Sequence, residues 1–116
     1  MNFNNLADEP IFATDRRGFK IYCDDEQMDY IYNYHPELRN FWATEADIKA
    51  AIQDAQVIYQ STHGSEYNIY YLRKRNKNTE LKVVVKFNEG VGIIWAVQPI
   101  SNRKPGEIII WPNMNP

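Results

Sequence analysis

Hydrophobic and polar residues alternate most regularly in the second half of the chain. Residues 81–87 place an apolar side chain at every second position, the period of two that sends alternate side chains to opposite faces of a sheet. Segments rich in aromatic and β-branched residues lie before and after it, at 67–73 and 92–98. Polar turns at 76–79 and 88–90 join the three segments, and no helical pattern separates them. We therefore predict an antiparallel meander of three strands.

The first half begins with a pattern typical of a small hairpin followed by a helix. Residues 11–14 and 19–23 are predicted as the two strands of the hairpin, with Gly18 in the left-handed conformation of the turn. An aspartate at position 24 or 25 then caps a helix. This helix is predicted to end before His35-Pro36, because the residue that precedes a proline is disfavoured in the helical region.

A second helix is predicted from its cap. Thr44 is followed three residues later by the acidic Asp47, the spacing of a capping box. The apolar face of this helix is formed by Ile48, Ala51, Ile52 and Ala55. Residues 57–60 are predicted as a short strand that enters the sheet. Residues 108–111 are predicted as a last strand, with an internal core strand as the preferred interpretation and an edge strand or an interface as the alternative. The predicted fold is α+β, with about two N-terminal helices packed on a mostly antiparallel sheet of four or more strands.

Length and composition bound the class of protein. At 116 residues the chain is predicted to be a single domain, 1–116, with a loose N-terminus (1–9) and a C-terminal tail (112–116). Cys23 is the single cysteine, which excludes an intrachain disulfide and a thiolate metal cluster. No apolar segment resembles a signal peptide or approaches the ~18 residues of a membrane span. We therefore expect a cytoplasmic protein without membrane association.

Charge is distributed unevenly along the chain. The net charge is −2, but residues 1–61 carry five basic and eleven acidic residues, a net charge of −6. Residues 62–116 carry eight basic and four acidic residues, a net charge of +4. This asymmetry is typical either of a surface that faces a polyanion or of two halves that are simply solvated. The eight tyrosines fit strands, interfaces and base-stacking surfaces equally well.

Two histidines are candidates for proton transfer near neutral pH. His35 follows the first predicted helix, where its alternative role is that of a terminal residue whose positive form suits the helix dipole. His63 lies in a polar loop that contains a glycine, where an exposed histidine needs no function. Because two histidines without a third ligand make a poor zinc site, we predict no metal site.

Basic and aromatic side chains are interleaved on the predicted meander. Lys82 and Lys86 share one face of the central strand, and Arg73 lies close to Tyr70 and Tyr71 on the neighbouring strand. Such a surface can hold phosphate and stack bases, whereas the alternative is a solvent face whose lysines prevent aggregation of strand edges. The sequence contains no glycine-rich phosphate loop, no Gly-x-Ser-x-Gly and no paired-cysteine motif.

The order of these segments resembles a known family. A helix that ends in His35-Pro36-Glu37 precedes a helix with Ile48 and Ile52, and the strand segments 57–60, 70–73, 81–86 and 92–97 follow. Over residues 11–111 this order is similar to the phage-linked nuclease-like domains grouped with barnase, EndoU, colicin E5/D and RelE (BECR nucleases). The resemblance implies two helices on a four-stranded antiparallel sheet, and metal-independent cleavage of RNA.

The resemblance also implies roles for individual residues. His35 matches the histidine at the helix end and would act as base or acid. Lys86 would supply positive charge from the sheet, and Tyr71 or Arg73 would stabilise the scissile phosphate. The nucleophile would be the 2′-OH of the RNA itself, so that no cofactor is expected. Further substrate-binding candidates are Lys82, Tyr70 and His63.

Two positions depart from the pattern of the family. The last strand of the sheet reads Trp95-Ala96-Val97-Gln98 where the family commonly carries a Thr and a Tyr, and Tyr34 stands where an Arg often precedes the histidine. The first hypothesis is a phage-encoded or toxin-type endoribonuclease, with RNA as partner and an antitoxin or inhibitor as a second one. The second hypothesis is a non-catalytic module of the same fold that binds a protein or a nucleic acid. The third is an inhibitor whose acidic first half faces a basic toxin.

Overall fold

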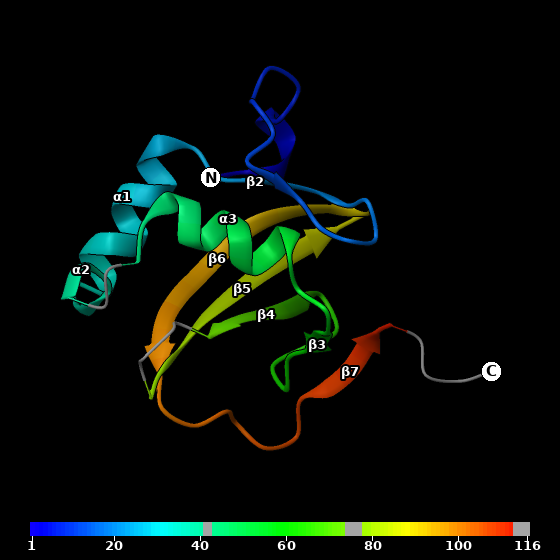
Figure 1. Cartoon of the computed structure of the whole chain (residues 1–116). Coiled ribbons are helices and arrows are strands. Elements are labelled where there is room, and N and C mark those ends of the chain that lie inside the picture. The colour runs from blue at the N-terminus through cyan, green and yellow to red at the C-terminus, as the bar shows by residue number, and fades with distance from the viewer. Residues whose placement is uncertain (41–42, 74–77, 113–116) are drawn as a thin grey trace.

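The computed structural model describes residues 1–40, 43–73 and 78–112. These residues form one mixed sheet with the α-helices packed on one face (Figure 1). The helices are the 3-10 turn η1 (Phe3–Asn5), α1 (Asp25–Tyr34), α2 (Glu37–Asn40) and α3 (Glu45–Gln53). The strands are β1 (Ala13–Thr14), β2 (Lys20–Tyr22), β3 (Ile58–Gln60), β4 (Tyr67–Arg73), β5 (Glu80–Asn88), β6 (Val91–Ile100) and β7 (Ile108–Trp111). The fold is therefore α+β, as the sequence predicts.

The strands of the sheet lie in the order β1-β2-β6-β5-β4-β3-β7. β4, β5 and β6 form the predicted meander, in which Val83 pairs with Tyr70 on one side and with Val97 on the other. β2 pairs with β6 in parallel, with Ile21 opposite Gly92. The other described pairings are antiparallel, so the sheet is mostly antiparallel as expected, and the β2–β6 pair makes it mixed. A parallel pairing between segments so distant along the chain leaves no local pattern in the sequence.

Gly92 allows β2 and β6 to approach each other closely. A Cβ atom at this position would lie 2.6 Å from Cγ1 of Val85 and 3.0 Å from Cγ1 of Ile21. Both neighbours are fully buried, so neither can move away into solvent. A side chain at this position would therefore force the parallel pair of strands apart.

Helix α1 begins and ends where the sequence predicts. Asp24 caps it by accepting a hydrogen bond from the backbone amide of Gln27 at 2.7 Å, and the helix ends at Tyr34. The side chain of Gln27 does not return to the cap as a capping box requires. It donates instead to the backbone carbonyl of Ile94 on β6, at 3.0 Å. This contact ties α1 to the sheet.

Helix α3 begins with the predicted capping box. The Thr44 side chain accepts from the Asp47 amide, and the Asp47 carboxylate accepts from the Thr44 amide at 2.9 Å. The prediction missed α2, a single turn that begins directly after Pro36, because one turn is too short for an apolar period to be visible. None of the described helices is long and apolar enough to cross a membrane.

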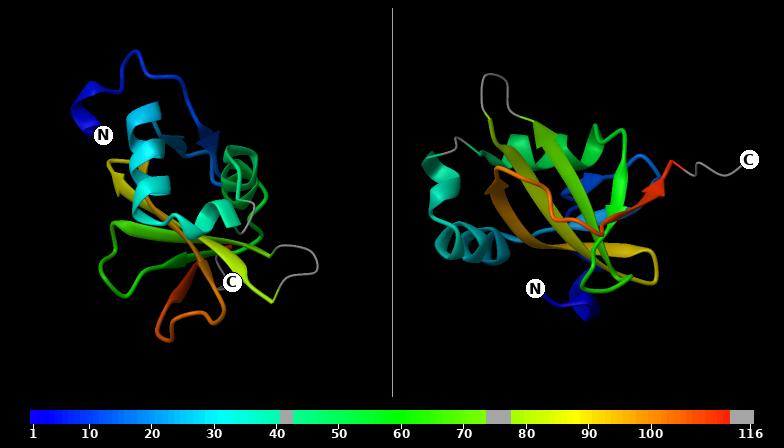
Figure 2. Two further views of the ribbon diagram at one scale, coloured as in Figure 1. Left: turned by 90° about the vertical axis from the view of Figure 1, so that its left-hand side faces the viewer. Right: turned by 90° about the horizontal axis from the view of Figure 1, so that it is seen from below.

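One hydrophobic core lies between the helices and the sheet. Its members from the helices and from the central strands are Met28, Ile31, Leu38, Ile48, Ala51, Ile52, Tyr70, Leu81, Val83, Val85, Ile94 and Val97. The sheet is curled, so that the turn between β1 and β2 approaches the strands at the opposite end (Figure 2). Arg17 in this turn donates to Oδ1 of Asn68 on β4 at 2.8 Å. The guanidinium carbon of Arg16 lies 5.6 Å from the ring centre of Trp111 on β7.

β7 forms one edge of the sheet. Among the described strands it pairs with β3 alone, and its Ile108 and Ile109 are 59% and 46% exposed. The preferred interpretation of residues 108–111 as an internal core strand was therefore wrong, and the structure has the alternative, an edge strand. Three consecutive isoleucines carry no alternation that distinguishes an edge strand from a buried one.

Candidate functional site

The face of the sheet turned away from the helices, here called the open face, carries both predicted lysines. Residues that pair directly across neighbouring strands point to the same side. Lys82 pairs with Tyr71 on β4 and with Gln98 on β6, and Lys86 pairs with Tyr67. Leu81, Val83 and Val85, which alternate with the lysines, belong to the core. The period of two in β5 therefore separates a buried apolar face from a basic and aromatic one.

A pocket of about 450 Å³ lies on the open face; we call it the sheet pocket. The β3–β4 loop supplies Ser61, His63 and Glu66, and the strands supply Tyr67, Lys82, Val84, Trp95, Ala96 and Gln98. It brings together a histidine and a lysine that the sequence singles out separately. The backbone amide of His63 donates to Oγ of Ser61 at 3.1 Å, and Nζ of Lys104 lies 3.4 Å from Nε2 of His63.

Lys82 is held in the sheet pocket by a carboxylate that the sequence analysis overlooked. Its Nζ donates to Oε2 of Glu107 at 3.1 Å, and the side chains of Lys82 and Glu107 are only 11% and 5% exposed. The Tyr71 hydroxyl donates to the other oxygen of Glu107. Burial, together with the Glu107 carboxylate, raises the pKa of Tyr71. Glu107 is the one hydrogen-bond partner of Lys82 among the described residues, so two of the three N–H groups of Lys82 have no partner in that part of the chain.

The loop between β6 and β7 brings Glu107 to this position. Arg103 fixes this loop to the sheet. Its guanidinium donates two hydrogen bonds to Glu80, at 2.9 and 2.7 Å, and one to the hydroxyl of Tyr59. The guanidinium carbon of Arg103 also lies 4.2 Å from the ring centre of Tyr71. The hydrogen bonds from Arg103 hold the pKa of Glu80 below its ordinary value.

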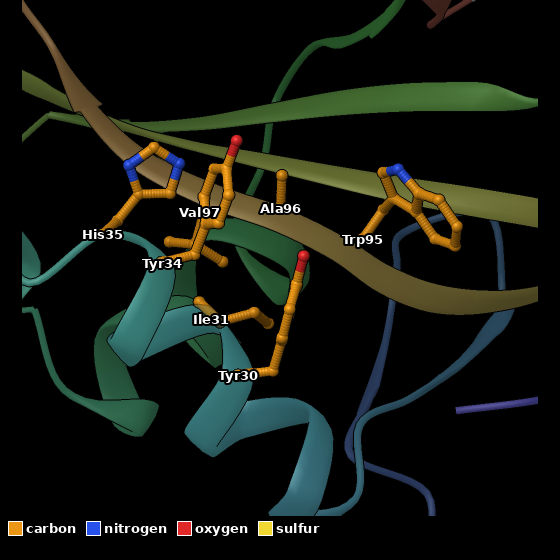
Figure 3. Close-up of a pocket in the computed structure, with 7 residues that line it drawn as sticks. All are labelled: Tyr30, Ile31, Tyr34, His35, Trp95, Ala96 and Val97. Atoms are coloured by element: carbon orange, nitrogen blue, oxygen red, sulfur yellow. The ribbon is translucent and has the colours of Figure 1, made fainter.

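A second pocket, of about 210 Å³, lies between α1 and β6; we call it the helix pocket. Tyr30 and Tyr34 project from α1 toward β6, as does His35, which caps the C-terminus of the helix (Figure 3). Trp95, Ala96 and Val97 of β6 form the other side of the pocket. Nδ1 of His35 lies 2.8 Å from Oε1 of Glu37. The pKa of Glu37 is lowered by a hydrogen bond from its own backbone amide and by the His35 ring.

The two pockets adjoin at Trp95 and Ala96, which line both of them. The register of β6 against β5 shifts at this point, because Val84 pairs with Ala96 whereas Val85 pairs with Ile94. Trp95 is therefore the extra residue of a β-bulge, which leaves its ring 46% exposed. The bulge gives the two pockets a shared aromatic wall, with His35 in one pocket and His63 and Lys82 in the other.

Lys86 lies beside this shared wall. Its Nζ is 4.7 Å from the ring centre of Trp95 and 5.8 Å from that of Tyr67. The two rings lie 6.0 Å apart and are tilted by 59°. The ammonium group therefore contacts two aromatic rings at the edge of the sheet pocket, an arrangement that concentrates positive charge there.

Four of the predicted residues line neither pocket. Lys86 and Tyr71 lie beside the sheet pocket, where they contact its residues Trp95 and Tyr67 or the Glu107 partner of Lys82, and the other two lie elsewhere. Tyr70 is fully buried on the helix side of the sheet, where its hydroxyl donates to Oδ2 of Asp15 at 2.8 Å. Burial and the Asp15 carboxylate raise the pKa of Tyr70. Arg73 is exposed and lines a separate hollow with Tyr71 and Arg103, near the end of α3. Neither residue lines the sheet pocket or the helix pocket.

The chemistry available in the two pockets is that of acids, bases and cations. Burial raises the pKa of the Cys23 thiol to about 12, so that its nucleophilic thiolate is scarce at neutral pH. Within the described ranges, no three His, Cys, Asp or Glu side chains gather as a ligand set for a metal ion. The pockets instead offer two imidazoles, the Glu66 carboxylate and the Lys82 ammonium group. These groups can transfer protons and neutralise a phosphate.

Comparison with protein-family models, with curated proteins and with solved structures finds no match for this chain.

Sequence reasoning missed Glu107, Glu66 and Trp95 as members of the site. Glu107 lies in a turn-rich segment after β6, where an acidic residue has no pattern that marks it. Trp95 lies in the apolar run 93–97, and such a run is equally consistent with a regular strand buried on both faces, so no local pattern marks the bulge.

Proposed function

We propose that this protein is a metal-independent endoribonuclease whose substrate lies across the sheet pocket and the helix pocket. The observation that supports this proposal best is that the pockets adjoin at Trp95 and Ala96. His35 lines one of the two pockets, and His63 and Lys82 line the other, across this shared wall. In this proposal a phosphodiester that bridges the two pockets meets a cation and two proton carriers, which are the groups that cleavage without a metal requires.

The reaction is an attack by the ribose 2′-OH on the adjacent phosphorus atom. The bond between the 2′ oxygen and phosphorus forms, and the bond between phosphorus and the 5′ oxygen of the next nucleotide breaks. One histidine accepts the 2′ proton, and the other, in its protonated form, donates a proton to the leaving oxygen. The products are a 2′,3′-cyclic phosphate and a free 5′-OH.

Lys82 and Lys86 stabilise the charge that develops on the phosphoryl oxygens. Lys82 is held by Glu107, which is itself bonded to Tyr71, so that its ammonium group is positioned before the substrate arrives. Lys86 contributes from the rim of the sheet pocket, beside Trp95. In this proposal Tyr71 positions Lys82 rather than touching the phosphate, and Arg73 and Tyr70 have no part in the chemistry.

The test is cleavage of a short single-stranded RNA and of total RNA in EDTA. We expect the wild-type protein to release products with 2′,3′-cyclic phosphate ends. Loss of a well-placed charged donor costs about a hundredfold or more in rate, and this is the loss expected for Lys82→Met and for Lys86→Ala. His35→Ala and His63→Ala should each lose activity, and each should remove one limb of the pH–rate profile.

Lys20→Met is a matched control, because Lys20 is an exposed lysine on β2 that lines neither pocket. This variant should cleave RNA at the wild-type rate. Intact RNA after incubation with the wild-type protein across pH 5–9 would overturn the proposal. Cleavage that both histidine variants retain would remove the histidines from the mechanism.

The second candidate function is a binding module that performs no chemistry. It is favoured by the apolar Trp95-Ala96-Val97 segment at the junction of the pockets, which offers no hydroxyl group to a reacting phosphate. A nucleic-acid binder should weaken steeply as the salt concentration rises, whereas an apolar protein interface should respond much less. Binding of RNA without cleavage would select this alternative.

A further inference from the structure

We infer that the helix pocket is a nucleobase site, which makes the substrate a single-stranded RNA held by one unpaired base. This inference rests on the proposed function and assigns a different part of the substrate to each of the two pockets. The helix pocket receives the uncharged base, and the sheet pocket receives the phosphate.

The first argument is the exposure of aromatic rings around the helix pocket. Tyr30, Tyr34 and Trp95 are 57%, 69% and 46% exposed, although large aromatic side chains are usually well buried. The rings of Tyr30 and Tyr34 stack 6.0 Å apart with an angle of 23° between their planes, and both face β6 across the pocket (Figure 3). Flat rings in such positions are platforms on which a base can stack.

The second argument is charge. The residues that line the helix pocket include no Lys, Arg, Asp or Glu, whereas Lys82, His63 and Glu66 line the sheet pocket. The exposed part of α1 is acidic, with Asp25, Glu26 and Asp29, and it would repel a phosphate. A neutral base therefore fits the helix pocket better than a phosphate does.

The third argument is the shape of the site. The helix pocket has a wall of α1 side chains on one side and β6 on the other (Figure 3). A base that enters it must leave its own stack and its pairing partner, which a double helix resists. The adjoining sheet pocket lies where the neighbouring phosphate would follow. His35, whose ring lies 5.0 Å from that of Tyr34, would border the ribose between them.

The experiment measures binding of a fluorescent hexanucleotide with 2′-O-methyl riboses, which cannot be cleaved because the nucleophile is blocked. The same strand in a duplex, and the same strand with abasic sites, are the comparison probes. We expect Tyr34→Ala and Tyr30→Ala to weaken binding of the single strand about tenfold or more. The dependence of affinity on salt should be unchanged in these variants, because no phosphate contact is lost.

The control variants separate this inference from the proposed function. Ile109→Ser removes an exposed apolar side chain at the β7 edge and should bind like wild type, and Lys82→Met should lower the salt slope by about one. If the tyrosine variants bind like wild type while Lys82→Met does not, the base site is excluded and the proposed function stands. Equal affinity for the abasic probe would also exclude the base site. If wild type binds none of the probes, both proposals fail.

Discussion

Tyr70 and Tyr71 are neighbours on β4, and they show how one arrangement of groups serves two purposes. Each hydroxyl donates to a carboxylate, Asp15 or Glu107. Each carboxylate pairs with a cation, Arg17 at 2.7 Å in the first case and Lys82 at 3.1 Å in the second. Because adjacent residues of a strand point to opposite faces, the first triad lies on the helix side and the second on the open face.

The two triads differ in how completely their hydrogen bonds are satisfied. The Asp15 carboxylate accepts from the backbone amides of Arg17 and Phe19, from the Arg17 guanidinium and from Tyr70, and its side chain is 0% exposed. Lys82 has a single partner among the described residues and lines a pocket. A buried network whose hydrogen bonds are all satisfied stabilises the fold, whereas a network with remaining donors beside a pocket can bind a ligand.

The largest expected effect is the loss of protein stability when the buried triad of Asp15, Arg17 and Tyr70 is broken. Asp15→Ala should lower the free energy of unfolding by about 3–5 kcal/mol, because it leaves Arg17 without its buried partner. Glu107→Ala should cost only about 1–2 kcal/mol, because Lys82 can turn into the sheet pocket and meet water. Urea unfolding followed by circular dichroism measures both values. Equal losses in the two variants would contradict the comparison.

The next prediction compares the loss of Lys82 with the loss of Arg17, the cations of the two triads, in RNA cleavage and in stability. Lys82→Met should lower kcat/KM on RNA about a hundredfold per folded molecule, and it should also cost about 3–5 kcal/mol of stability, because it leaves the buried Glu107 carboxylate without its cation. Arg17→Met should lower the stability by a similar amount and leave the activity per folded molecule unchanged. Kinetics and urea unfolding on the same protein preparations measure the two quantities. A loss of activity per folded molecule in Arg17→Met as large as that in Lys82→Met would remove the distinction.

The tyrosines themselves provide a finer comparison. Tyr70→Phe should cost about 1.5–3 kcal/mol of stability, because a buried hydrogen bond to a charged carboxylate is lost. Tyr71→Phe should cost about 0.5–1.5 kcal/mol and should also lower kcat, because Lys82 is held less firmly through Glu107. Thermal and urea unfolding test the first expectation, and RNA cleavage tests the second. Unchanged kcat in Tyr71→Phe would show that Lys82 needs no such support.

The smallest effect concerns pH. Arg103 lowers the pKa of Glu80 in the folded protein, so the contribution of Glu80 to stability is complete above its unfolded pKa of about 4.3. It is lost as the pH falls through the lower folded pKa. Unfolding measured between pH 7 and pH 3 should show wild type more stable than Glu80→Gln by less than about 1 kcal/mol at pH 7. This difference should vanish at the acidic end, and a difference that grows on acidification would have the wrong sign.

The local elements of the fold could be predicted from the sequence, because their causes are local. The aspartate cap of α1, the capping box of α3 and the alternation in β5 are all visible within a few residues, and the structure confirms them. Gly18 takes a φ of 90° in the predicted hairpin turn, and Glu89 and Gly90 take φ values of 52° and 79° between β5 and β6. The predicted turn residues 76 and 77 lie outside the described part of the chain.

The long-range features could not be predicted, because they depend on which segments meet in space. The parallel pairing of β2 with β6 and the edge position of β7 are properties of the whole sheet. The same holds for the site. Lys82 and His63 were visible as residue types, but the pocket that unites them depends on a β-bulge at Trp95 and on the loop that carries Glu107. Tyr70 and Tyr71 look equivalent in the sequence, and only the direction of the strand separates their roles.

The curl of the sheet has a consequence for the order of folding. Strands β3 to β6 follow one another along the chain and can pair as soon as neighbouring segments meet. The N-terminal hairpin must instead wait for partners far along the sequence, since Ile21 pairs with Gly92 and Asp15 bonds to Tyr70, which is 55 residues away. Closing such long loops is slow, because entropy is lost before any contact forms. We therefore expect the N-terminal hairpin to pack last, after the meander of β4, β5 and β6 has formed.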